Sequence, residues 1–210
     1  MPGQRGTAET APGASLRGRR RSGEADRIIL LKTLEVLGQV GYTGFTVNEV
    51  IARAGVSSAT LYRRWPSKTD LVAAAIASLG RPSVEIDNGS LAADLAAYVD
   101  YLGAEFAHPT GLAGAWADSA RFDPAMRDVM DETFIAPRRQ LLGDILRRAF
   151  GRGELAAIPP LGDCWSFVSG PIHHRMHIRN KSFTRPFARD TAVVVTAGLV
   201  ALAARRADRS

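Results

Sequence analysis

The segment SSATLYRR at residues 57–64 combines small polar side chains with one tyrosine and two arginines. Small side chains such as Ser58, Ala59 and Thr60 would let a helix approach base edges closely in the major groove of DNA. Arg63 and Arg64 can bind phosphates or guanine edges. Eight residues form barely two helical turns, which are unstable alone. The segment therefore has the chemistry to read DNA, provided that its neighbours hold it in place.

The preceding residues predict a short helix that ends in a glycine turn. Thr46 and Glu49 form the T-x-x-E pattern of a capping box. An apolar stripe follows, and Gly55 is expected to end the helix. Ser57 or Ser58 can then cap the next helix. Two short helices joined by a glycine turn, with small polar and basic residues exposed on the second, match a helix-turn-helix.

Two further helices are expected on either side of this unit. Apolar residues recur at helical spacing from about Glu24 and stop at Gly41, which predicts a helix of about four turns. Ser67 can cap another helix that continues to Gly80. The N-terminus of that helix carries a partial positive charge, and Lys68 adds a full one. This end suits a phosphate.

The stretch FTVNEVIARAGVSSATLYRRWPSKTDLVAAAI resembles the DNA-binding domain of the TetR repressor family, over about residues 28–79. The Gly-Val-Ser turn, Leu-Tyr, an aromatic residue, Pro and Ser-Lys follow in register, with Trp65 where Phe is more frequent. The resemblance implies that Thr46, Tyr62 and Lys68 bind phosphates, while residues 58–60 and Arg63 face bases or flanking phosphates. The expected DNA-binding residues are Thr46, Ser57, Ser58, Ala59, Thr60, Tyr62, Arg63, Arg64 and Lys68.

The remainder of the chain also has helical periodicity, so the expected fold is all-α. An N-terminal three-helix helix-turn-helix DNA-binding domain would precede a C-terminal helical domain for ligand binding and dimerisation. The expected domains are a disordered basic arm (1–22), the helix-turn-helix domain (23–66), a connecting helix (67–80) and the effector-binding and dimerisation domain (81–210). Candidate helices in the last span 91–107, 112–120, 125–150, 163–180 and 187–206.

The family resemblance implies a homodimer formed through the last two helices and an effector pocket enclosed by the middle ones. The expected function is that of a repressor, released from a palindromic operator by a small, largely apolar effector. The residues expected at the pocket are Tyr98, Tyr101, Trp116, Phe122, Met126, Phe134, Phe167 and His174. No cofactor, metal or catalytic residue is expected.

Charge supports a polyanionic partner for the first third of the chain. Residues 1–80 hold 11 Lys and Arg against 6 Asp and Glu, whereas residues 81–210 hold 16 against 15. Four arginines lie between Arg17 and Arg21, either as a DNA-binding arm or as a solubilising tail. The lone Cys164 favours a reducing compartment. The apolar run 192–204 is too short for a membrane span, so a cytoplasmic location is expected.

Two alternative functions stay open on sequence alone. His173, His174 and His177, with Cys164 upstream, could form a metal or thiol site of an enzyme, because His173 and His177 lie one helical turn apart. No carboxylate or cysteine adjacent to the histidines completes a ligand set, and the sequence contains no nucleophile–base motif. The other alternative is an architectural DNA-binding protein without an effector.

Overall fold

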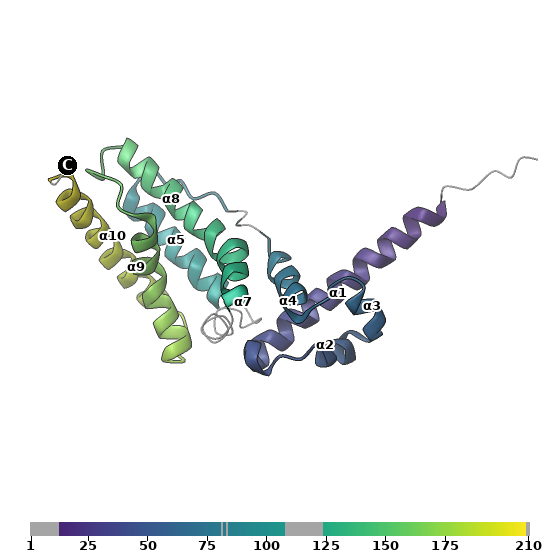
Figure 1. Ribbon diagram of the computed structural model, residues 1–210. Helices are drawn as coiled ribbons and strands as arrows, with labels where there is room; N and C mark the ends of the chain where they lie inside the picture. Colours follow the sequence, from purple (N-terminus) through teal and green to yellow (C-terminus); the bar gives the residue numbers. More distant parts are fainter. Residues whose placement is uncertain (1–12, 81, 83, 108–123, 209–210) are drawn as a thin grey trace, which may run out of the picture.

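The computed structural model describes residues 13–80, 82, 84–107 and 124–208, and within these ranges it contains helices and no strand. The all-α prediction is therefore confirmed. Figure 1 shows two parts that meet at α4: a small head formed by α1–α4 and a bundle formed by α5–α10. The described helices are α1 (Gly13–Gly44), α2 (Val47–Ala54), α3 (Ser58–Tyr62), α4 (Lys68–Ala77), α5 (Leu91–Phe106), α7 (Pro124–Met130), α8 (Ala136–Gly151), α9 (Leu161–His173) and α10 (Arg185–Ala207).

The first helix begins earlier than the sequence pattern predicts. Residues 13–22 were expected to be disordered, but they continue α1 by ten residues towards the N-terminus. Extending an existing helix needs no new nucleus, and the Ala, Leu and Arg residues of this stretch are good helix formers. The predicted end at Gly41 corresponds to a backbone break, because φ there is 66°. Residues 1–12 lie outside the described part.

The helix starts in the head follow the predicted caps, with one difference. Ser57 Oγ accepts the Thr60 amide at 3.2 Å and so caps α3. Ser67 and Asp70 form a complete, reciprocal capping box at α4. Thr46 accepts the Glu49 amide at 3.4 Å, but the Glu49 carboxylate pairs with an arginine one turn later instead of returning to Thr46. The box at α2 is therefore only half formed.

The glycine turn between α2 and α3 requires its glycine. Gly55 has φ 65° and ψ 32°, the left-handed conformation of a helix C-cap. Its amide and that of Val56 both bond to the Ile51 carbonyl, at 3.0 and 3.3 Å. A side chain at Gly55 would cost roughly 1 to 2 kcal/mol in this conformation. The turn thus sets the angle between the two helices.

The bundle is built around α5, which packs against α8, α9 and α10. The predicted helix over residues 125–150 is divided, because a π-helical turn (Asp131–Ile135) lies between α7 and α8. A second π-helical turn (His174–Ile178) follows α9. Helix α4 packs against α1 on one side and against α7 and the first π-helical turn on the other. It is therefore the link between head and bundle.

Candidate DNA-binding head and effector cavity

Residues 57–64, called the reading segment below, are anchored by one buried side chain, and most of their other side chains are exposed. Leu61 is fully buried in the head core. Ser57, Ser58, Ala59 and Arg63 are exposed, Thr60 is half-buried, and Tyr62 is 46% exposed. The arrangement presents small and polar side chains at the start of α3 and larger ones at its end. This is the geometry in which a short helix can enter a major groove.

The two arginines after α3 differ in their surroundings. Arg64 is half-buried and forms an ion pair with Asp26 of α1, and its Nη1 donates to the Thr60 carbonyl at 3.0 Å. Arg63 is exposed, and among the described residues its guanidinium has no ion pair or hydrogen bond. Arg64 thus ties α3 to α1, whereas Arg63 is available for another molecule. Both remain predicted DNA contacts.

Lys68 lies at the junction of α4 with the end of α1. Its Nζ donates to the Tyr42 carbonyl at 2.7 Å and lies 4.1 Å from the centroid of the Tyr42 ring. Tyr42 Oη and Thr69 Oγ1 are 3.2 Å apart, so the same joint has a second polar contact. Thr46 is exposed at the start of α2. Phosphate binding by Thr46 and Lys68 remains a prediction.

A cavity of about 260 Å³ opens between α5, the first π-helical turn and α9. Its walls are mostly aromatic and aliphatic, with two serines and one histidine from α9. The described residues that line it are Phe106, Met130, Phe134, Ile135, Trp165, Ser166, Ser169, Gly170 and His173. An apolar cavity with a few polar groups is the usual form of a small-molecule site.

Of the predicted pocket residues that the structure describes, one lines this cavity, namely Phe134. Met126 is buried in the core, Tyr98 is buried and donates to the Arg138 carbonyl at 2.7 Å, and half-buried Tyr101 packs against the core. Burial raises the pKa of Tyr101 to about 12. His174 is exposed and does not line the cavity. Trp116 and Phe122 lie outside the described residues.

A buried arginine contacts Phe134, one of the residues of the cavity wall. Arg138 is 2% exposed, forms an ion pair with Glu105, and donates from Nη1 to the Phe134 carbonyl at 2.9 Å. Its guanidinium carbon lies 3.6 Å from the centroid of the Phe134 ring, a cation–π contact. Arg138 therefore contacts both the ring and the backbone of Phe134 in the first π-helical turn.

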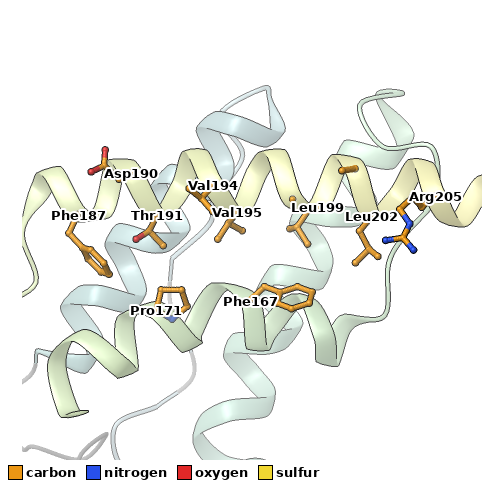
Figure 2. A pocket seen from close by; sticks show the side chains of 12 residues that line it. Phe167, Pro171, Phe187, Asp190, Thr191, Val194, Val195, Leu199, Leu202 and Arg205 are labelled. Atoms are coloured by element: carbon orange, nitrogen blue, oxygen red, sulfur yellow. The ribbon is translucent and has the colours of Figure 1, made fainter. Parts of the chain in front are cut away.

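Phe167 lies in a different place from the one predicted. It is 54% exposed and lines an apolar groove of about 650 Å³ between α9 and α10. Figure 2 shows Phe167 of α9 facing Leu199 and Leu202 of α10, and Pro171 facing α10 near Thr191. On the surface of α10, Val193 and Val194 are 65% and 70% exposed. Exposed apolar area of this kind marks an interaction surface.

Helix α10 is also the one described helix that is long and apolar enough to cross a membrane, judged by length and composition alone. The core helices of soluble proteins pass the same test, and one third of the apolar window is buried within the chain. Length and composition of α10 are therefore weak evidence for a membrane span.

The alternative thiol or metal site finds no support in the geometry. Cys164 is buried, and burial raises the pKa of its thiol to about 11, with Asp163 as a second cause. A thiol with this pKa is a poor nucleophile at neutral pH. Within the described residues no three His, Cys, Asp or Glu side chains are arranged to hold a metal ion.

Sequence reasoning missed most of the cavity wall, although one signal was available. Trp165, Ser169 and His173 are spaced at i, i+4 and i+8, which places them on one face of α9. That face carries the polar groups of the cavity. No comparable signal marks Phe106, because its place beside α9 depends on how α5 packs.

A helix-turn-helix head joined to a separate helical bundle with a cavity defines a DNA-binding regulator. Residues 29–75 match the family of bacterial regulatory proteins of the tetR type, and residues 85–195 match the tetracyclin repressor-like C-terminal domain. The chain belongs to the TetR family of transcriptional regulators. The regulators of this family are soluble cytoplasmic proteins that bind DNA operators, dimerise and bind small molecules.

An uncharacterised HTH-type transcriptional regulator of Mycobacterium tuberculosis is 34% identical over 165 residues, which cover 78% of this chain and 79% of the relative. A TetR-family transcriptional regulator from Rhodococcus sp. has a similar fold, with a TM-score of 0.65, 21% identity, and coverage of 84% and 99% of the two chains. FadR from Bacillus subtilis, solved with stearoyl-CoA, aligns with a TM-score of 0.62 at 15% identity over 83% and 97%. Family membership points to a regulator rather than an enzyme.

Proposed function

We propose that the protein is a homodimeric repressor that leaves a near-palindromic operator when a small, largely apolar effector enters the cavity between α5, the first π-helical turn and α9. One observation carries the proposal. The segment that supplies Met130, Phe134 and Ile135 to the cavity wall also packs against α4, the helix of the head that contacts the bundle. A ligand that displaces this wall therefore acts directly on the support of the reading segment.

The coupling needs two arrangements of one element, with the effector favouring one of them. The π-helical turn is suited to this, because such turns are rare insertions that often lie at functional sites. Arg138 holds its Phe134 ring in the ligand-free arrangement through the contacts described above. A ligand that presses on Phe134 competes with those contacts and shifts α4.

The α9–α10 groove supports the dimer part of the proposal. Its lining comes from one face of α10 and from Phe167 and Pro171 of α9, and the adjoining valines of α10 are exposed. A second copy of the same surface would bury this apolar area about a twofold axis. Two heads related by that axis would read two halves of a palindrome.

A cavity-blocking variant tests the regulatory part. Compounds that raise the melting temperature of the wild-type protein should also weaken its binding to the operator. Ser169→Phe fills the cavity from α9, so the same compounds should lose both effects while operator binding without ligand is retained. A screen in which no compound alters both melting temperature and operator affinity would instead favour the architectural alternative.

A further inference from the structure

Two histidines lie where the effector cavity adjoins a second opening. His173 lines the cavity, and its ring centroid is 5.1 Å from that of His177. His177 meets the ring of Phe106 edge-on at 6.2 Å and lines a more open cavity of about 550 Å³. Phe106 lines both cavities. His173 therefore brings an imidazole to the largely apolar effector cavity, and His177 lies beside it at the adjoining cavity.

Polar atoms of the cavity lining and of the neighbouring His177 can accept hydrogen bonds from a ligand. The Ser166 and Ser169 hydroxyls already donate to the carbonyls of Gly162 and Trp165, at 3.0 and 2.8 Å, so their oxygens are left to accept. His177 Nε2 is buried and has no hydrogen-bond partner among the described residues. A buried polar atom without a partner costs free energy until a ligand supplies one.

The surroundings of both imidazoles favour the neutral form. Burial lowers the pKa of His173 and of His177 below the ordinary 6.5, with the neighbouring histidines as a weaker cause: His174 acts on His173, and His173 acts on His177. The charged side chains that line the adjoining cavity are Asp100 and Lys181. A neutral imidazole offers one acceptor nitrogen.

We propose that the effector is a compact phenol-like compound whose hydroxyl donates to the His173–His177 pair while its apolar body packs against Phe106, Met130 and Phe134. This inference rests on the proposed function, since it takes the cavity as the effector site. The volume of about 260 Å³ lies below the roughly 300–1,000 Å³ of sites for drug-sized ligands, which restricts the body to about one ring. A carboxylate fits less well, because its charge would be buried without a cation or would require a charged imidazole.

Three probes of matched shape test the ligand class on the full-length protein: 4-ethylphenol, 4-ethyltoluene and 4-ethylbenzoate. Calorimetry measures their affinities, and an operator-release assay measures their effect on DNA binding. The phenol should bind about tenfold or more tightly than the toluene, because only the phenol satisfies the buried acceptor. It should also bind more tightly than the benzoate.

Variants then test whether the hydroxyl of 4-ethylphenol binds to His173 and His177. His173→Phe and His177→Phe remove the acceptors at similar size, so 4-ethylphenol and 4-ethyltoluene should bind these proteins with nearly equal affinity. His174→Phe changes an exposed residue of the same helical segment and should keep the wild-type preference. His177→Gln provides a different acceptor at this position and should recover part of the preference for 4-ethylphenol over 4-ethyltoluene.

Some outcomes overturn the inference and leave the regulator intact. Equal binding of phenol and toluene to the wild-type protein, tighter binding of the benzoate, or no binding of 4-ethylphenol up to its solubility limit would each reject the phenol class. Operator binding without ligand and the Ser169→Phe screen are independent of these probes. Those two experiments would show a failure of the proposed function. Either the protein would bind operator and random DNA equally, or no compound would release it from the operator.

Discussion

At the scale of single residues, neighbouring side chains of the same type have different tasks in the head. Arg64 is half-buried and paired with Asp26, so it positions α3 against α1. Arg63 is exposed and makes no such pair among the described residues. Residue type alone therefore predicts the chemistry of this segment, and only the packing separates the residue that holds the helix from the one that faces outward.

Arg63→Ala should reduce the preference for the operator over random DNA. An arginine that bonds a guanine edge contributes about 1 to 3 kcal/mol of discrimination. Competition binding with operator and random duplexes measures the change. Arg53→Ala is the control, because Arg53 on α2 is occupied by Glu49 and Gln39 and should leave the preference unaltered. Equal losses of affinity on both duplexes would remove Arg63 from the readers.

At the scale of elements, sequence reasoning worked where local chemistry decides the structure. The caps at Ser57 and Ser67 and the turn at Gly55 follow from short patterns, and the structure contains all three. The π-helical turns and the α9–α10 groove depend on how distant helices pack, which no local pattern reports. The predicted pocket residues lie in different places for the same reason: Tyr98 is as apolar in body as Phe134, yet it is buried in the core, whereas Phe134 lines the cavity.

The helical extension of α1 gives the arginine-rich arm a defined direction. Asp26 fixes α1 beside the end of α3, and a helix rises about 1.5 Å per residue, so Arg21 to Arg17 lie roughly 7 to 14 Å further along α1. Residues 1–22 also carry five of the 11 positive charges of residues 1–80, against one Glu. If α3 enters the major groove as proposed, the direction of α1 would carry the arm towards the DNA beside that groove.

Replacing Arg17, Arg19, Arg20 and Arg21 by Gln should weaken binding to operator and random DNA alike. Each phosphate contact contributes about 0.9 to the slope of log affinity against log salt, so the slope should fall by up to about 3 to 4. A salt titration measures it. Arg147→Gln, an exposed site in the bundle, is the control and should not alter the slope. An unchanged slope in the fourfold variant would leave the arm as a solubilising tail.

At the scale of the whole molecule, helices α4 and α5 connect the regions proposed for DNA binding, effector binding and dimerisation. Helix α4 contacts α1 in the head and the π-helical turn at the cavity wall, while α5 carries Phe106 to the cavity and packs against α9 and α10. The proposed dimer contact, effector and DNA would therefore all act on one continuous set of packed helices. Because packed interfaces have discrete arrangements, a small displacement at the cavity can move a whole head.

Val194→Glu should convert the protein to a monomer and abolish tight operator binding. The substitution places a charge on a side chain that is 70% exposed on the free chain, so the monomer fold should be preserved. Light scattering gives the mass and circular dichroism checks the fold. Val84→Glu puts the same charge on an exposed valine outside the groove and should remain dimeric. A Val194→Glu protein that stays dimeric would place the interface elsewhere.

The most direct test of the central claim is the selection of bound duplexes from a random-sequence DNA pool by the full-length protein. A dimeric regulator should enrich an inverted repeat whose half-site centres lie about 10 base pairs, or a multiple of that, apart. A compound that raises the melting temperature should release these duplexes. A pool without an enriched sequence, or with a single unrepeated motif, would contradict the dimeric regulator proposed for this chain.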